Sequence, residues 1–419
     1  MKYQSLRGTH DILPDQTPVW QYVEKKIHDK LQSCGFSEIR TPAIEQSELF
    51  TRSIGDLTDI VSKEMYTFED KGGRSISLRP EATASVVRSA IEHNLAIKDK
   101  ISKLYYIGPM FRYERPQAGR FRQFYQAGVE LIGSSSAFAD AEVVLAGVLL
   151  FNSLGLRSLE VEINSVGCEK CRPGYEKELK KYLKDNSSKL CSDCNERIGK
   201  NVLRVLDCKK EGCRSVISSA PSLKEMICEE CKTHFEQLTE SLGSFGVKVS
   251  VNEKLVRGLD YYTKTTFEIV SKELGAQNAV CGGGRYDTLI EQLGGSKIPA
   301  VGMAIGLERL ISVMEAQKLL PEPEKNLALY IAAIGLEAQK KAFKQVFELR
   351  KSGVSAETDL LGKSLKSQLK AADNLGAKYV LIMGEEEIKK GVFPLRNMKT
   401  GDQKEIRLEE LHREIEQAC

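Results

Sequence analysis

Apolar residues in the first part of the chain recur at spacings that distinguish predicted helices from predicted strands. Residues 14–33 carry apolar side chains three or four positions apart, which is the spacing of an amphipathic helix. Residues 36–46 predict a strand that leads into a break at Pro42, and residues 75–79 alternate as a second strand does. A helix with Thr83 in its first turn is predicted to follow directly.

The next stretch predicts a long hairpin. Residues 103–113 and 123–132 both have the character of strands, and a polar loop joins them. Strand-like sequence occurs again at residues 247–251 and 265–270, and the glycine cluster Gly282–Gly284 comes after it. The hairpin carries arginines on both arms, so it is the element that most needs a functional explanation.

Changes in composition divide the chain further. Eight of the eleven cysteines lie within residues 168–231, and we interpret residues 168–245 as a Cys-rich module inserted into a larger domain of residues 1–320. Residues 317–326 are rich in proline and charge and predict a linker. Strands and helices alternate in residues 326–419, which predicts a separate small α/β domain with a parallel or mixed sheet.

The overall composition narrows the class of protein. Hydrophobic residues make up 41% and charged residues 28% of the chain, as in soluble globular proteins. The first residues lack the apolar segment of a secretory signal, and the longest apolar run, Val143–Phe151, is far shorter than the roughly 20 residues of a membrane span. We therefore expect a cytoplasmic protein with no membrane partner, whose cysteines are reduced or bind metal rather than form disulfides.

Charge is informative only where it clusters. The net charge is +3, but residues 340–370 hold eight Lys and Arg residues against three acidic ones. Such a surface either faces a polyanion or is simply a solvated helical face, and charge alone favours the second interpretation.

Several arginines lie where an anion would explain them. Arg112 is on a predicted strand, Arg120 is in the hairpin loop, and Arg257 and Arg309 have apolar neighbours. A guanidinium group is costly to bury without an anion, and it matches phosphate in a bidentate manner. The chain has no GxxxxGK[ST] loop, because Glu357 stands where the first glycine should be. If the protein binds ATP, it does so with arginines and a sheet.

Three segments resemble the motifs of class II aminoacyl-tRNA synthetases. Residues 16–42 are similar to the helix and strand that end at a proline, Phe111-Arg112-Tyr113-Glu114 to the second motif, and Gly306-Leu307-Glu308-Arg309 to the third. Four further segments resemble the histidine subfamily: Arg257–Tyr262 (RGLDYY), Gly282–Asp287 (GGGRYD), Arg7–Pro14 and Leu78–Thr83, the last with Ala82 where glycine is usual. The chain thus resembles the histidyl-tRNA synthetases from about residue 5 to its end.

This resemblance implies a fold and a reaction. The fold is α/β, with an α+β catalytic core whose antiparallel sheet is flanked by helices, and with a C-terminal α/β anticodon-binding domain. The reaction is the ATP-dependent ligation of L-histidine to tRNA(His) through histidyl-adenylate, assisted by Mg²⁺ and releasing AMP and pyrophosphate. The resemblance also implies a homodimer.

The resemblance assigns roles to individual residues. Those expected to act in catalysis are Arg112, Arg257 and Arg309. Those expected to bind ATP are Arg112, Glu114, Arg120, Phe124 and Arg309. Those expected to bind histidine are Glu81, Thr83, Gln126, Glu130, Tyr261 and Tyr262. Arg115 and Gln117 are expected to meet the acceptor end of tRNA, and residues 363–370 are a further candidate for tRNA contact.

The spacing of the cysteines suggests metal sites that the resemblance does not require. Cys168, Cys171, Cys191 and Cys194 fit one four-thiolate zinc site, and Cys208, Cys213, Cys228 and Cys231 fit a second. The alternative is eight reduced thiols that bind no metal. In this family an insertion at this place lies over the tRNA acceptor arm, so structural zinc would replace a core too small to hold itself together.

Two other functions fit the sequence less well. A catalytically silent paralogue, like the regulatory subunit of ATP phosphoribosyltransferase, usually lacks the C-terminal domain and the catalytic arginines, which this chain keeps. A zinc-dependent nucleic-acid-binding protein would explain the cysteines but not the three motifs.

Overall fold

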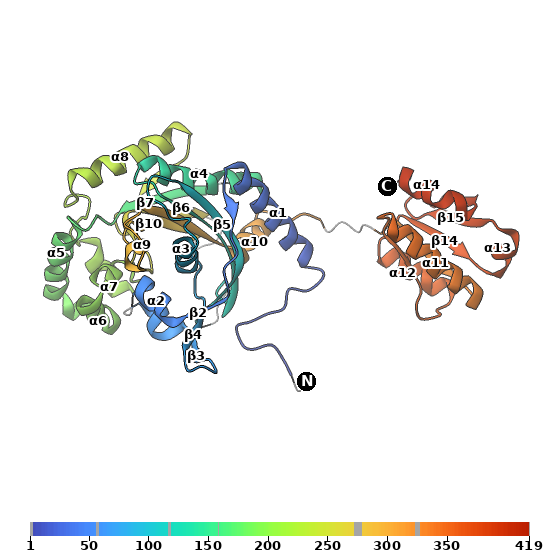
Figure 1. Ribbon diagram of the computed structural model, residues 1–419, viewed down its shortest axis with the longest axis horizontal. Coiled ribbons are helices and arrows are strands. Elements are labelled where there is room, and N and C mark those ends of the chain that lie inside the picture. Colours follow the sequence, from blue (N-terminus) through green and yellow to red (C-terminus); the bar gives the residue numbers. More distant parts are fainter. Residues whose placement is uncertain are drawn as a thin grey trace. The chain divides into compact units, whose positions relative to one another are not determined.

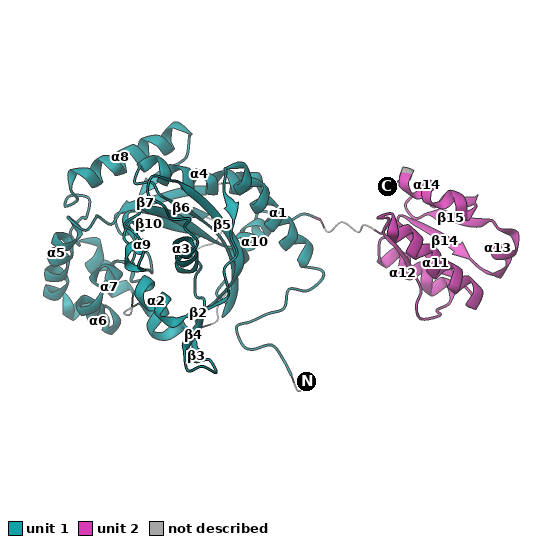
Figure 2. Ribbon diagram, viewed as in Figure 1, with its two compact units in different colours: residues 1–321 teal, residues 322–419 magenta. Residues whose placement is uncertain are grey.

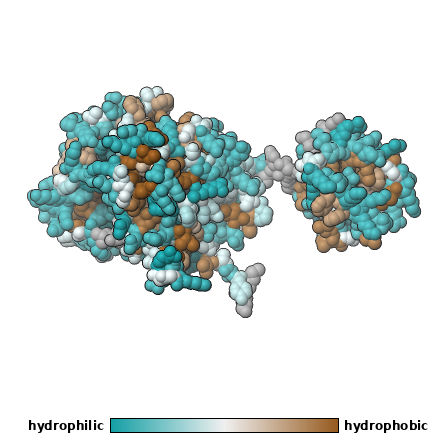
Figure 3. All heavy atoms as spheres, in the orientation of Figure 1, coloured by the Kyte–Doolittle hydropathy of each residue, from teal (hydrophilic) through white to brown (hydrophobic). Residues whose placement is uncertain are grey.

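The computed structural model describes residues 3–55, 58–115, 119–157, 159–271, 279–322 and 327–418. The chain divides into two compact units, residues 1–321 and residues 322–419 (Figure 1, Figure 2). Figure 3 shows mainly hydrophilic residues on the visible face of each unit, with apolar residues in small groups. Among the described residues, no helix is long and apolar enough to cross a membrane.

An eight-stranded sheet forms the centre of the first unit, in the order β1-β5-β6-β11-β10-β9-β7-β8. Its strands are β1 (Ser37–Glu38), β5 (Ser102–Phe111), β6 (Gln123–Ile132), β11 (Ala300–Gly306), β10 (Ala279–Arg285), β9 (Thr263–Ser271), β7 (Leu159–Ser165) and β8 (Val249–Val251). Neighbouring strands are antiparallel except at the two edges, where β1 pairs with β5 and β8 with β7 in parallel. The expected antiparallel sheet flanked by helices is confirmed.

One face of this sheet is apolar and packs against four helices, one of which is α8 (Glu229–Ser244). Val129 of β6 and Met303 of β11 join a core that includes residues of α1 (Thr17–Ser33), α4 (Ala137–Ser153) and α10 (Leu307–Ala316). The opposite face carries α3 (Thr83–Glu92) over β5, where Val86 and Val87 belong to the same core as Tyr106. Since side chains alternate between the faces of a strand, the residues next to Val129 and Met303 point toward the side of α3.

A small sheet lies beside α3, in the order β2-β4-β3. Its strands are β2 (Ile44–Gln46), β3 (Tyr66–Glu69) and β4 (Ser75–Leu78), accompanied by α2 (Ser47–Ile54), a π-helical turn (Ile60–Glu64) and α9 (Leu289–Gln292). The single strand predicted over residues 36–46 is wrong, because β1 and β2 belong to different sheets. The guanidinium of Arg79 donates to the carbonyl of Thr41 at 2.9 Å and fixes the chain between the two strands.

The Cys-rich module is helical. It contains α5 (Arg172–Asp185), α6 (Ser192–Lys200), α7 (Glu211–Ser218) and α8 (Glu229–Ser244), with 3₁₀ turns at Ser187–Lys189 and Val202–Asp207. Leu179 and Leu183 of α5 belong to the same apolar cluster as Val216 of α7, whereas Leu238 and Leu242 of α8 join the core beneath the main sheet. The last helix of the module thus also belongs to the packing of the catalytic unit.

The second unit is a five-stranded sheet in the order β13-β12-β14-β15-β16, covered by helices. Its elements are β12 (Leu329–Ala333), α11 (Leu336–Lys351), β13 (Ala356–Thr358), α12 (Leu365–Asn374), β14 (Tyr379–Met383), α13 (Glu385–Lys390), β15 (Phe393–Asn397), β16 (Gln403–Ile406) and α14 (Leu408–Ala418). The first three strands are parallel and the last two are antiparallel, so the predicted mixed α/β domain is present. The sequence did not predict the four elements from α13 to α14.

Candidate active site

Glycines make the floor of a polar site on the face of the main sheet that bears α3. A Cβ atom added to Gly302 would lie 1.8 Å from Glu130 Oε2, and one added to Gly282 would lie 2.3 Å from Arg257 Nη2. Real Cβ atoms never approach so closely, so only glycine lets these side chains lie flat on the sheet. The same holds on neighbouring strands, and the four positions Gly128, Gly282, Gly284 and Gly302 together form the glycine floor.

Glu130 lies at the centre of this floor. Its carboxylate is 1% exposed, accepts a hydrogen bond from Thr83 Oγ1 at 2.8 Å, and accepts another from the Tyr286 hydroxyl. Burial raises the pKa of Glu130 to about 8, although the hydrogen bonds from Tyr286 and Thr83 oppose this shift. A buried carboxyl group that shares protons with two hydroxyls is suited to bind a polar group that both donates and accepts.

A second carboxylate lies at the start of α3. Glu81 accepts hydrogen bonds from the amides of Thr83 at 2.7 Å and Ala84 at 2.9 Å, which are two of the free amides of the first turn. Burial raises the pKa of Glu81, although these amide hydrogen bonds favour its charged form. The helix start therefore brings Glu81 and Thr83 to the same site as Glu130.

Tyrosines form one wall of the site. The ring centroids of Tyr261 and Tyr262 are 4.7 Å apart, and those of Tyr261 and Tyr286 are 5.7 Å apart. All three rings are buried, and a Cβ atom on Gly284 would lie 2.8 Å from Tyr262 Cδ1. Burial raises the pKa of Tyr262 to about 12, so its hydroxyl stays neutral and can donate a hydrogen bond.

Gln126 extends the site along β6. It lies two residues from Gly128 and pairs with Gly306 of β11, so its side chain is on the same face as Glu130. Within the described part of the chain, its Oε1 atom is buried and has no hydrogen-bond partner. Such an atom is costly unless a ligand supplies a donor.

Arginines and a carboxylate lie at the loop end of the hairpin, between β5 and β6. Glu114 lies 3.7 Å from Arg112 and 3.3 Å from Arg120. The Arg112 guanidinium lies over the ring of Phe124 at 5.2 Å from its centroid, and its Nε donates to the Pro80 carbonyl at 2.8 Å. The hairpin thus places two cations and one flat aromatic ring beside the start of α3.

Arg257 and Arg309 lie on the side of the site toward β9 and β10. Arg257 is paired with Glu268, which raises its pKa although burial acts in the opposite direction. Arg309 donates to the Ala279 carbonyl at 3.2 Å, and burial together with the nearby Arg120 lowers its pKa. Arg309 interacts electrostatically with both Arg120 and Arg257, so the four arginines gather beside the same part of the site, an arrangement suited to a polyphosphate.

The resemblance assigned two residues to the tRNA acceptor end. Arg115 is exposed, and Gln117 lies outside the described residues. The structure brings together the other residues that the resemblance assigned to histidine and ATP, all on or beside one face of the sheet.

A family model described as histidyl-tRNA synthetase matches residues 8–310, and one described as anticodon binding domain matches residues 328–418. The chain belongs to the histidyl-tRNA synthetase family. The histidine–tRNA ligase of Halothermothrix orenii is 50% identical over 416 residues, 99% of each chain, and that of Acetivibrio thermocellus is 51% identical over 98% of this chain and 99% of its own. The crystal structure of apo S. aureus histidyl-tRNA synthetase covers 99% of each chain with a TM-score of 0.83 and 37% identity.

Two buried tyrosines of this synthetase site were missed from sequence. Tyr286 donates to Glu130, and the Tyr106 hydroxyl lies where a Cβ atom of Gly128 would be. A sequence signal was available for Tyr286 alone, which lies in the GGGRYD segment; Tyr106 is placed opposite Gly128 by the strand register.

A buried ion cluster supports the site from the end of β10. Arg285 is fully buried and bonds to Asp140 at 2.6 Å and Asp287 at 2.7 Å. The second oxygen of Asp140 is 2.7 Å from His234 Nε2 on α8. Because Tyr286 directly follows Arg285, this cluster fixes the strand end that carries the hydroxyl bonded to Glu130.

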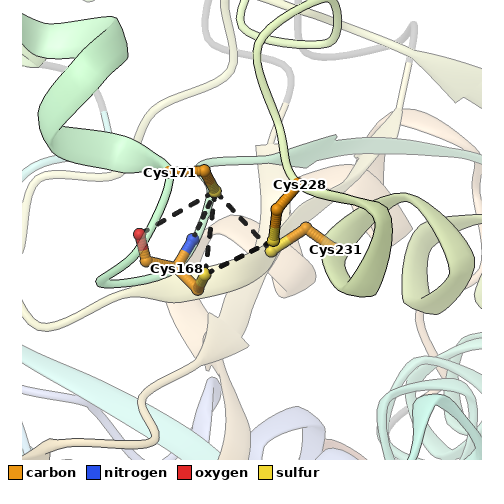
Figure 4. Close-up of side chains that lie close together, drawn as sticks. All are labelled: Cys168, Cys171, Cys228 and Cys231. Atoms are coloured by element: carbon orange, nitrogen blue, oxygen red, sulfur yellow. Dashed lines mark hydrogen bonds between the residues drawn. The ribbon is translucent and has the colours of Figure 1, made fainter.

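The eight cysteines form two groups, but not in the expected combinations. The first two and last two cysteines of the module in sequence, Cys168, Cys171, Cys228 and Cys231, lie together and are called the outer group (Figure 4). The four between them in sequence, Cys191, Cys194, Cys208 and Cys213, are called the inner group. Pairing the first four cysteines along the chain was wrong. Strands β7 and β8 are parallel neighbours, so α8 must begin beside the end of β7, where Cys168 and Cys171 lie.

The geometry of the outer group fits a tetrahedral ion. Its Sγ atoms are 3.7 Å apart for Cys168 and Cys171, 3.7 Å for Cys168 and Cys228, and 3.8 Å for Cys171 and Cys231. Four thiolates bound to zinc at about 2.3 Å would be about 3.8 Å apart. In each group, all four sulfur atoms lie within 4.8 Å of one another.

Proposed function

We propose that this chain ligates L-histidine to tRNA(His), using ATP and proceeding through histidyl-adenylate. The observation that carries the proposal is the buried Glu130, bonded to Thr83 and Tyr286 on a floor of glycines beside four arginines. Membership of the histidyl-tRNA synthetase family supports the same activity.

Histidine would bind over the glycine floor. Glu130 and Tyr261 would bond to the imidazole, while Tyr262 lines the pocket. Glu81, Thr83 and the free oxygen of Gln126 would hold the α-ammonium group. Because these polar groups are buried, an amino acid that left them unpaired would be rejected by a factor of about 10⁴.

ATP would bind at the end of the hairpin. Phe124 would stack on adenine and Glu114 would accept from its amino group. Arg112 and Arg257 would contact the α-phosphate, while Arg120 and Arg309 would contact the β- and γ-phosphates. Mg²⁺ would neutralise the departing pyrophosphate. The four arginines supply positive charge without a phosphate loop, as the sequence requires.

The first chemical step would be an in-line displacement. A carboxylate oxygen of histidine attacks the α-phosphorus, and the bond to the bridging oxygen of pyrophosphate breaks. The protein contributes position and charge neutralisation, with no covalent intermediate. The terminal hydroxyl of tRNA then attacks the adenylate carbonyl, and AMP leaves.

The tRNA acceptor end would approach between the hairpin tip and the Cys-rich module. Arg115 and Gln117 would contact it from the hairpin. A cavity of about 520 Å³ between the module and the catalytic sheet is lined by six cations and two carboxylates: Arg172, Lys177, Lys180, Lys200, Arg204, Arg257, Glu176 and Asp260. Its excess of positive charge suits a sugar-phosphate chain. The second unit would contact the anticodon, with residues 363–370 as a candidate surface.

The two cysteine groups would each hold one structural Zn²⁺. The sulfur separations in the outer group support this proposal. Metal analysis of the purified protein should give two zinc ions per chain. Absence of zinc together with eight freely reactive thiols would contradict the proposal.

The chain would act as a homodimer built on residues 16–42, as the resemblance implies. Sedimentation equilibrium tests this directly, and a monomer at micromolar concentration would contradict it. The alternative, a silent regulatory paralogue, is less favoured because the four arginines and the anticodon-binding unit are both present.

Histidine-dependent ATP–pyrophosphate exchange tests the main proposal. The measurement should be made with each of the twenty amino acids and without tRNA. Of the twenty amino acids, only histidine is expected to support exchange. Absence of exchange with histidine would contradict the proposal. Arg257→Ala should lower the rate strongly while the oligomeric state is unchanged; loss of the oligomer would mean that Arg257 is structural.

A further inference from the structure

Arg172 connects the Cys-rich module to the histidine pocket through main-chain atoms. It is the first residue of α5 and directly follows Cys171 of the outer group. Its guanidinium donates to the carbonyl oxygens of Val166 at 3.0 Å and Gly167 at 3.4 Å, and also to that of Tyr262. One module side chain thereby holds both the entry to the module and the end of the RGLDYY segment.

This placement is costly for an arginine. Its side chain is partly buried, and among the described residues it forms no ion pair, although its guanidinium donates to three main-chain carbonyl oxygens. A charged donor in such a position is tolerated only when the hydrogen bonds that it makes are needed. The bond to Tyr262 is the one that reaches beyond the module's own entry segment.

The carbonyl of Tyr262 is coupled to the shape of the pocket. The Tyr262 ring lies directly over Gly284 of the glycine floor, and it is 4.7 Å from the ring of Tyr261. A shift of this carbonyl would therefore move two rings that line the proposed imidazole site. Neither ring belongs to the arginine and aromatic residues proposed to hold ATP.

Two further contacts from the module reach the same short segment. Asn201, at the end of α6, donates through Nδ2 to Asp260. Glu230, between two cysteines of the outer group, accepts from Lys264 Nζ at 2.9 Å, and the Lys264 amide donates to the Gly167 carbonyl at 2.8 Å. Module side chains thus contact residues 260, 262 and 264 of this segment, in addition to the bond from the Asp260 amide to the Ile54 carbonyl outside the module.

We propose that Arg172 is a positioning residue for the amino-acid pocket, and that the module acts in histidine activation before any tRNA binds. The inference rests on the proposed function and deepens it. Arg172 also lines the cavity proposed for tRNA, but tRNA contact alone would not require its bond to the Tyr262 carbonyl. By holding the Tyr262 carbonyl, Arg172 fixes Tyr261 and Tyr262 where the imidazole would meet them.

The test is ATP–pyrophosphate exchange by the full chain in the absence of tRNA. Arg172→Met should raise the KM for histidine by about 10-fold, as expected for loss of a hydrogen bond from a charged donor, with the KM for ATP changed less than about 2-fold. Arg172→Lys keeps a charged donor and should recover part of the loss. Asn201→Ala should give a smaller change in the same direction.

Arg197→Met is the matched control. Arg197 also joins the module to the catalytic unit, through Asp59 at 2.9 Å, but it does not touch the tyrosine segment. Its histidine KM should stay near that of the wild type. Equal effects of Arg172→Met and Arg197→Met, or parallel rises in the KM for ATP and histidine, would overturn the proposal, because they would mean that Arg172 only docks the module.

Stability is measured alongside, so that misfolding is recognised. If Arg172→Met unfolds, Arg172→Lys and Asn201→Ala decide the question through the same split between the two KM values. Hydrogen exchange adds an independent readout: the amides of residues 260–264 should exchange faster in Arg172→Met than in Arg197→Met. A wild-type protein without histidine-dependent exchange would instead refute the proposed function itself.

Discussion

The glycine floor and the Cys-rich module lie side by side in the first unit, and they owe their shapes to opposite features of the sequence. The floor lies inside a fully hydrogen-bonded sheet, and its form is set by side chains that are absent. The module, described in full over residues 168–245, contains no strand, and eight thiols in two groups mark the points where its turns meet. The shape of the floor thus depends on the absence of side chains, and that of the module depends on thiol groups that can bind metal.

This difference predicts which kind of substitution each region tolerates least. In the floor, a single added carbon collides with a functional atom held by rigid backbone on both sides. In the module, a change of volume matters less than the loss of a metal ligand. Activity should therefore be most sensitive in the floor, and metal content and stability most sensitive in the module.

Gly302→Ala should have the largest effect. The new Cβ atom would lie 1.8 Å from Glu130 Oε2 and 2.7 Å from the Val129 carbonyl, which is backbone and cannot easily move. We expect histidine-dependent exchange to fall by about 10³-fold, comparable to removal of a principal transition-state contact. Gly243→Ala, in α8, is the control, because its Cβ atom would meet no atom within 4 Å and would be tolerated. Similar losses in both variants would contradict the special role of the floor.

Glu130→Gln should have the next largest effect on activity. The amide keeps the volume but cannot accept from Thr83, Tyr286 and an imidazole as a carboxyl group does. The kcat/KM for histidine should fall by about 100-fold, with a much smaller change in the KM for ATP. An unchanged preference for histidine would place the imidazole elsewhere.

The same variant should reveal a pH dependence of stability. Burial raises the pKa of Glu130 from 4.5 to about 8, so between these values the folded protein keeps a proton that the unfolded chain has released. Glu130 therefore lowers the free energy of unfolding as pH rises through this window. The Tm of Glu130→Gln relative to wild type should rise by about 2–4 °C from pH 5 to pH 8. A constant difference would contradict the raised pKa.

The module predicts a different readout, the number of zinc ions per chain. The double variant Cys168→Ser/Cys191→Ser removes one ligand from each group and should lose both ions. Cys168→Ser/Cys228→Ser removes two ligands from the outer group and should lose one. Pairing in order along the chain would give the reverse result, so the two variants are controls for each other. Both should lower Tm, since binding of a structural ion contributes directly to the free energy of folding.

The sequence predicted local features of both regions, but not how distant segments combine. The strand over residues 123–132 and the helix with Thr83 in its first turn occur as expected, because hydrophobic spacing and turn residues determine them locally. The roles of Tyr106 and Tyr286 around Glu130 depend on strand register across the sheet, which no local pattern contains. The cysteine combinations were predicted wrongly for the same reason, since the parallel pairing of β7 and β8 brings the two ends of the module together.

Substitution of Cys281 should have the smallest effect. This cysteine belongs to the strand that carries the glycine floor and not to the module. It lies on β10 between Val280 and Gly282, on the apolar face of the sheet, and is 2% exposed. Burial raises the pKa of its thiol to about 12, so it is neither a nucleophile nor a metal ligand. Cys281→Ala should change the rate of histidine-dependent exchange by less than about 2-fold and should leave the zinc content intact, with a stability loss of about 1 kcal/mol. Protection of the Cys281 thiol from alkylation in the native protein would agree with its buried position. Rapid alkylation that abolished exchange would instead mean that the thiol reaches the site. In that case thiol chemistry would matter in the floor as well as in the module.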